Sequence, residues 1–172
     1  VIIPGSESAA KQTKNNKIGV IGTKGTINSE SYKKQIHKVN RNVKVFSQAC
    51  SLFVQLAEDG WTDNRIAELT AKEYLTDIKQ RGIDTMILGC THYPILKKTI
   101  GKVVGKKIKL IDSGEETAKE VKNILTNRNL LNTQKKKGEH KFFVTDFPNN
   151  FHQIAERFLG TKIKNIKLAK LH

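Results

Sequence analysis

Cysteine is scarce in this sequence: the 172 residues contain only Cys50 and Cys90. Two cysteines this far apart do not form a disulfide framework, and they favour a reduced, cytoplasmic compartment. No apolar run approaches the roughly 18 residues that span a bilayer, and the opening VIIPGSESAA lacks the segments of a signal peptide. The chain begins with valine rather than methionine, which indicates a fragment or a processed start. A membrane protein and a disulfide-rich secreted domain are both disfavoured.

Acidic residues are also few, 16 against 31 lysines and arginines, so the formal net charge is +15. Such a charge invites a nucleic-acid partner. The excess is nearly all lysine, however, and it is scattered among Asn and Ile, as in KQTKNNKIGV. Specific readers of DNA or RNA usually carry arginine forks or stacking aromatic residues, and here neither is interleaved with the lysines. These features disfavour nucleic-acid binding as the main function.

What the sequence does contain is an alternation of short apolar runs with helix-period stretches. Strands are predicted at residues 17–23, 43–49, 85–90, 107–112, 141–146 and 163–169. Helical spacing is found at 26–39, at 63–80, from residue 113 onward and after Pro148, with Gly160 as a suitable helix end. This alternation predicts an α/β protein with a largely parallel sheet.

Three details of the helices are predicted from capping signals and apolar spacing. Thr70 and Glu73 form a possible capping box, which would start a new helix within 63–80. Ser113 and Glu116 form a second one. The helix after it would bury one apolar face, made of Ala118, Val121, Ile124 and Leu125.

Small or reactive residues end three of the predicted strands: Gly22-Thr23, Ala49-Cys50 and Gly89-Cys90. Ligands of parallel sheets collect beyond the carboxyl ends of the strands. If these three strands are neighbours, their ends converge on one crevice.

Cys90 has several possible roles from its surroundings alone. It could be a small apolar packing residue, since cysteine is often buried. A metal site is disfavoured because Cys-x-His supplies two ligands at most and no second Cys/His cluster has suitable spacing. The preceding Gly89, the following Thr91 and His92, and a helix start near Ile95 favour a reactive thiol. A nucleophile and an acid/base thiol remain open alternatives.

The segment ILGCTHYPIL, residues 87–96, resembles the second catalytic-cysteine motif of glutamate racemases. The resemblance covers essentially the whole chain and extends to four other segments: IGVIGTKGTINSESY, QACSLFVQLAEDGW, LIDSGEETAKEV and FFVTDFPNNFHQIAERFLG. It implies a three-layer, parallel-sheet α/β domain of the aspartate/glutamate racemase type. Aspartate racemases usually have Glu where this chain has His92, so the motif favours glutamate.

The resemblance implies a racemase that uses neither metal nor pyridoxal phosphate, but two thiols on opposite faces of the substrate. Cys90 would act on the L-glutamate face and His92 would assist its proton transfer. Thr91, Thr23 and Thr26 would contact the substrate. Glu58 matches a family acidic residue near the site, although a solvated carboxylate at a helix end is an equal alternative. Cys50 matches no catalytic position and is interpreted as a packing residue.

Two departures from the family accompany this resemblance. Ser51 and Gln55 stand where the family usually has proline. The family's N-terminal half, with its first catalytic cysteine, has no counterpart here. Residues 1–111 are therefore expected to form the second domain, and residues 112–172 a returning segment that would complete the missing first one. The parent protein is expected to be a homodimeric, cytoplasmic enzyme of peptidoglycan synthesis, and this fragment to be inactive alone. The alternatives are an aspartate or hydantoin racemase and a non-catalytic basic nucleic-acid-binding fragment.

Overall fold

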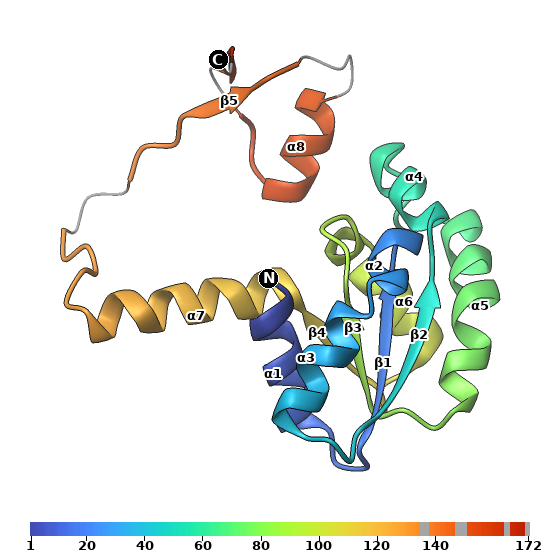
Figure 1. The fold of residues 1–172 in the computed structure, drawn as a ribbon. Helices are drawn as coiled ribbons and strands as arrows, with labels where there is room; N and C mark the ends of the chain where they lie inside the picture. Colours follow the sequence, from blue (N-terminus) through green and yellow to red (C-terminus); the bar gives the residue numbers. More distant parts are fainter. Residues whose placement is uncertain (135–137, 147–150, 164–165, 171–172) are drawn as a thin grey trace.

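A parallel sheet of four strands forms the centre of the molecule (Figure 1). The computed structural model describes residues 1–134, 138–146, 151–163 and 166–170. The strand order is β2-β1-β3-β4, which confirms the predicted α/β class. The bounds are β1 (Lys17–Gly22), β2 (Lys44–Ala49), β3 (Thr85–Leu88) and β4 (Lys109–Asp112).

Helices cover both faces of this sheet, so the domain has three layers (Figure 1). One face carries α1 (Ile2–Gln12) and α3 (Ser31–Val39). The other carries α4 (Leu52–Glu58), α5 (Arg65–Gln80), α6 (Lys97–Val104) and the 3₁₀ turn Tyr93–Leu96. Side chains alternate along each strand. Val20 of β1 therefore packs into the core beneath α1 and α3, and Ile21 packs into the core beneath α4, α5 and α6. All four residues of β3 are buried, as expected for a central parallel strand.

The C-terminal third continues from β4 directly into α7 (Ser113–Asn127), which packs against α1. Beyond it, β5 (Phe142–Val144) and β6 (Ile166–Leu168) form a separate parallel pair, with α8 (Phe151–Leu159) between them in sequence. The predicted strands and final helix are thus confirmed, and Gly160 adopts the left-handed φ of 65° at the helix end. Pro148, expected near the start of α8, lies outside the described residues. Within the described part of the chain, no helix has the length and apolar character to span a bilayer.

The prediction of a helix start at Thr70 is wrong, because α5 runs unbroken from Arg65 to Gln80. Asn64 caps it instead, its side-chain oxygen accepting from the Ala67 amide at 2.9 Å. The face that α5 buries is built from small residues as well as large ones: Ala67, Ala71, Leu75 and Ile78. Two larger apolar residues of the same helix, Ile66 and Leu69, are about half exposed. Close packing on the sheet therefore favours alanine over these larger side chains.

The helix α7 also departs from expectation at its start and along its apolar face. Asp112 is its N-cap and accepts from the amides of Gly114 and Glu115, so Ser113 is the first helical residue rather than the cap. Carboxylate capping satisfies two free amides and suits the positive end of the helix dipole. The predicted buried face is open, since Val121 and Ile124 are 49% and 41% exposed.

Asp84 ties the start of β3 to the turn that precedes β1. Its carboxylate accepts from the Thr13 hydroxyl at 2.7 Å and from the Lys14 and Asn15 amides at 2.7 and 2.8 Å. Partial burial acts to raise the pKa of Asp84, but these hydrogen bonds prevail and hold that pKa below its usual value.

Replacing Asp84 with Asn should destabilise the domain by about 1 kcal/mol at pH 7, because an NH₂ group would then face these donors. A lowered folded-state pKa gives stability that is complete above the unfolded pKa, near 4, and is lost as the pH falls through the folded value. The melting temperatures of wild type and D84N should therefore differ at pH 7 and converge below about pH 4. D77N, the same change at exposed Asp77 of α5, is the control and should not lower the melting temperature. If the melting temperatures of wild type and D84N differed equally at pH 7 and at pH 3, this role of Asp84 would be contradicted.

Candidate functional site

The three strand ends singled out in the sequence meet at one edge of the sheet, as predicted. β1 lies between β2 and β3, and the pairing aligns Gly22 with Ala49 and Ile21 with Leu88. The backbone connections continue past the strands: the Cys50 amide donates to the Gly22 carbonyl at 2.8 Å. The carboxyl edge of the sheet therefore presents the Thr23, Cys50 and Cys90 loops side by side.

Packing requires glycine at position 89, which also lines a hollow beside Cys90. Its amide donates to the Ile21 carbonyl at 2.8 Å. A Cβ at this position would lie 2.7 Å from that carbonyl oxygen and 3.0 Å from the Tyr32 ring. Only glycine lets β3 run this close to β1 and α3.

Cys90, His92 and Glu58 form a continuous series of polar side chains. The tight turn after β3 is closed by the Tyr93 amide, which donates to the Cys90 carbonyl at 3.1 Å. This turn places Nδ1 of His92 3.9 Å from Sγ of Cys90, and Nε2 of His92 3.1 Å from Oε1 of Glu58. Glu58 is the last residue of α4, more than thirty positions away in sequence.

The protonation of the imidazole follows from its two neighbours. An ionised carboxylate only accepts hydrogen bonds, so Nε2 of His92 carries a proton and donates it toward Glu58. In the neutral ring this leaves Nδ1 unprotonated and facing the thiol, where it can accept from Sγ–H. When protonated, the same ring favours the thiolate of Cys90.

A hollow of about 340 Å³ opens beside Cys90. Thr91 and Thr26, for which the family resemblance implies substrate contacts, line this hollow, whereas Thr23 is not among its lining residues. Thr23 instead caps α2 (Lys24–Asn28), accepting from the Thr26 amide at 3.3 Å and lying 3.1 Å from the Thr26 hydroxyl.

Sequence reasoning missed Tyr32, Asp112 and Ser113 as residues of this hollow. The Tyr32 and Ser113 hydroxyls are 3.1 Å apart and both side chains are buried. Burial raises the pKa of Tyr32, so this phenol stays protonated and able to donate. The end of β4 held the signal for Asp112 and Ser113, because β4 neighbours β3 and its carboxyl end meets the same edge.

Cys50 is not among the residues that line the hollow. It is fully buried, and burial raises the pKa of its thiol to about 12. Its carbonyl accepts from the buried Tyr93 hydroxyl at 2.9 Å. Of the two thiols, only Cys90 has both access and a titratable partner.

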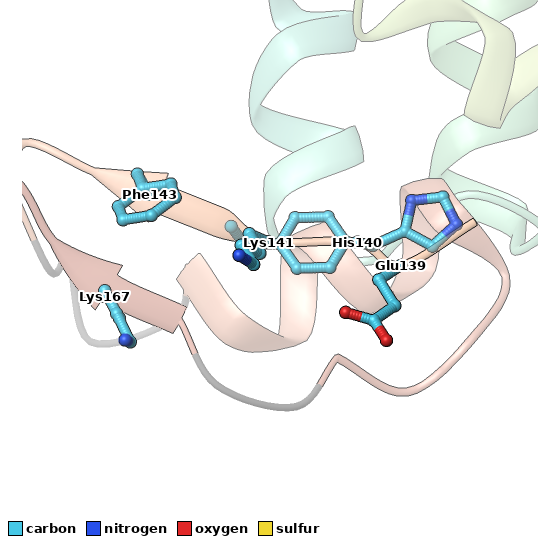
Figure 2. Close-up of a pocket in the computed structure, with 6 residues that line it drawn as sticks. Glu139, His140, Lys141, Phe143 and Lys167 are labelled. Carbon is cyan, nitrogen blue, oxygen red and sulfur yellow. The ribbon is translucent and has the colours of Figure 1, made fainter.

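Other kinds of site were sought among the described residues. In that part of the chain no three His, Cys, Asp or Glu side chains are grouped so as to hold a metal ion. A second hollow of about 360 Å³ lies on the β5–β6 unit (Figure 2). There the Glu139 carboxylate and the His140 imidazole point away from each other, so they do not form an acid/base pair like that of Glu58 and His92.

A thiol, an imidazole and a carboxylate thus meet at the carboxyl edge of the parallel sheet, in an α/β domain of three layers. The Asp/Glu/Hydantoin racemase family matches residues 3–121, and the chain belongs to this family.

Several of the similar proteins are glutamate racemases. The one from Geobacter metallireducens is 49% identical over 166 residues, covering 96% of this chain and 62% of the relative. The solved structure of the Francisella tularensis enzyme in complex with D-glutamate is 41% identical, with a TM-score of 0.88 over 98% of this chain and 62% of that one. The solved structure of glutamate racemase isoform RacE1 from Bacillus anthracis is 40% identical, with a TM-score of 0.90, and the match covers 99% of this chain and 64% of that one. This chain thus spans less than two thirds of the length of the relatives it matches.

Proposed function

We propose that the whole protein to which this chain belongs is a glutamate racemase that interconverts L- and D-glutamate for peptidoglycan synthesis. The single observation that carries the proposal is the arrangement Cys90–His92–Glu58 beside a hollow, in a chain that is 49% identical to a glutamate racemase. In this reaction one group removes the α-proton from one face of the amino acid and another returns a proton to the opposite face.

In the proposed mechanism, Cys90 is the acid/base on the L-glutamate face. As thiolate it takes the α-proton and becomes a thiol, and in the reverse direction the thiol gives this proton back. His92 stabilises the thiolate when the imidazole is protonated, and accepts a hydrogen bond from the thiol when the imidazole is neutral. Glu58 holds Nε2 of His92, and this keeps Nδ1 of His92 directed at the sulfur of Cys90. An α-proton is far less acidic than a thiol, so donors around the hollow must stabilise the developing negative charge.

Thr91 and Thr26 are proposed to contact the substrate, since both line the hollow with Cys90. Thr23 is proposed to act beside them, and its contact with the Thr26 hydroxyl supports this. Thr23 can cap α2 and orient the Thr26 hydroxyl at the same time.

The second thiol is proposed to come from the part of the relatives that this chain does not match, because burial makes Cys50 unsuitable. In this proposal residues 1–111 form one domain, and residues 112–172 return to complete another. The exposed apolar side chains of α7 support such a partner surface. The whole protein is proposed to be a cytoplasmic homodimer.

The test is a chimera in which this chain replaces the matching residues of the Geobacter metallireducens relative. Incubated with L- or D-glutamate and no added cofactor, the chimera should racemise either isomer, followed by circular dichroism. The 172-residue chain alone should show no turnover. A folded chimera without turnover would contradict the proposal, and turnover by the chain alone would contradict the need for a second thiol.

The nearest rival is activity on aspartate or a hydantoin, which the same chimera tests in a substrate panel. A preference for either over glutamate would replace the proposed substrate.

A further inference from the structure

The helix α8 reaches from the C-terminal third of the chain to the His92–Glu58 pair. Its Phe158 ring lies against the His92 imidazole, with centroids 5.6 Å apart and planes at 87°. Its Arg157 donates to the main-chain carbonyl of Glu58 at 3.1 Å. Two adjacent residues of one helix thus contact both members of the pair.

These contacts complete the surroundings of the imidazole. Sγ of Cys90 lies toward Nδ1, Oε1 of Glu58 lies toward Nε2, and the Phe158 ring packs edge to face with the imidazole. The Cys90 contact is long at 3.9 Å, so a small rotation of the imidazole would break it. An aromatic neighbour in this T-shaped geometry opposes that rotation and covers part of the ring from water.

We propose that Phe158 is a positioning residue for His92, and that Arg157 assists it by holding the end of α4 that carries Glu58. The proposal rests on the function proposed above and adds a role for a residue outside the matched family region, which ends at residue 121. Phe158 acts through His92 and is not among the residues that line the hollow.

Several ionisable groups surround Cys90 and His92, and Phe158 is not one of them. Glu58 comes from α4, Arg157 from α8, Tyr32 from α3, Tyr93 from the turn itself and Asp112 from β4. Replacing Phe158 with Leu alters no charge. A change in the pH dependence of Cys90 reactivity in F158L therefore reports the position or hydration of the imidazole.

The test is the rate of Cys90 alkylation by iodoacetamide in this chain between pH 5 and pH 10, measured by mass spectrometry. H92N should move the rate profile toward that of a free thiol, near pH 8.5, and so define the full effect of the imidazole. F158L should move it in the same direction by about half a pH unit, which is about threefold slower at pH 7. F158Y, which keeps the ring, and L159A, an exposed change on the same helix, should match the wild type.

The outcomes separate this proposal from the proposed function. If H92N shifts the profile and F158L does not, the positioning role is overturned and the role of His92 stands. If H92N itself has no effect, the assigned role of His92 fails and the positioning role fails with it. If circular dichroism shows that F158L is unfolded, two other measurements test the proposal. These are the alkylation profile of R157A and the ring-current shift of the His92 proton signals in the folded wild type. An unshifted His92 signal, or an unchanged profile in R157A, would then overturn the proposal.

Discussion

Replacing Cys90 with Ala in the chimera should lower the rate of glutamate racemisation by about a thousandfold, the range expected for loss of a positioned acid/base group. The reason is positional: Cys90 is the accessible thiol beside the hollow, and its sulfur faces His92. Racemisation is measured by circular dichroism from either isomer.

Exchange of the α-proton in D₂O tests which face of glutamate Cys90 acts on. C90A should lose exchange of the α-proton of L-glutamate, whereas D-glutamate, approached by the opposite thiol, should still exchange without inversion. C50A is the matched control, since Cys50 is the other cysteine of the chain, is fully buried and does not line the hollow. It should keep racemase activity within about twofold and lose only stability. Loss of exchange from D-glutamate alone in C90A would reverse the assignment of faces.

Replacing Phe53 with Ala should destabilise the domain by about 3–5 kcal/mol, the largest stability effect predicted here. Phe53 is 1% exposed, and its ring packs edge-on against Tyr74 and Tyr93 with centroids 5.4 and 5.3 Å away. Removing it leaves a cavity between α4, α5 and the turn after Cys90. In urea the unfolding midpoint should fall accordingly, and the melting temperature by about 10 °C.

Leu52 provides the control for this second prediction, because it precedes Phe53 on the same helix and is 56% exposed. L52A should change the free energy of unfolding by about 0.5 kcal/mol or less. If F53A cost no more than L52A, the core described between α4 and the sheet would be wrong.

The order and type of the main elements could be predicted because they follow from local spacing. The buried run at β3 sufficed to place Cys90 at the end of a strand. Helix starts were less predictable, since Asn64 and Asp112 compete with Thr70 and Ser113 as caps and only the path of the chain selects between them. The open face of α7 could not be foreseen either, because periodicity shows that a face is apolar and not what covers it.

By itself, then, the sequence determined the α/β class, the resemblance to a racemase family and the choice of Cys90 as the candidate acid/base thiol, since each of these follows from contiguous residues. Only the tertiary structure decided which partners that cysteine has. Glu58 reaches His92 from the end of α4, Asp112 and Tyr32 meet at the hollow, and Phe158 arrives from the far end of the chain. Such contacts join residues separated by tens of positions, and their distances depend on how strands pair and helices pack, which local spacing does not encode.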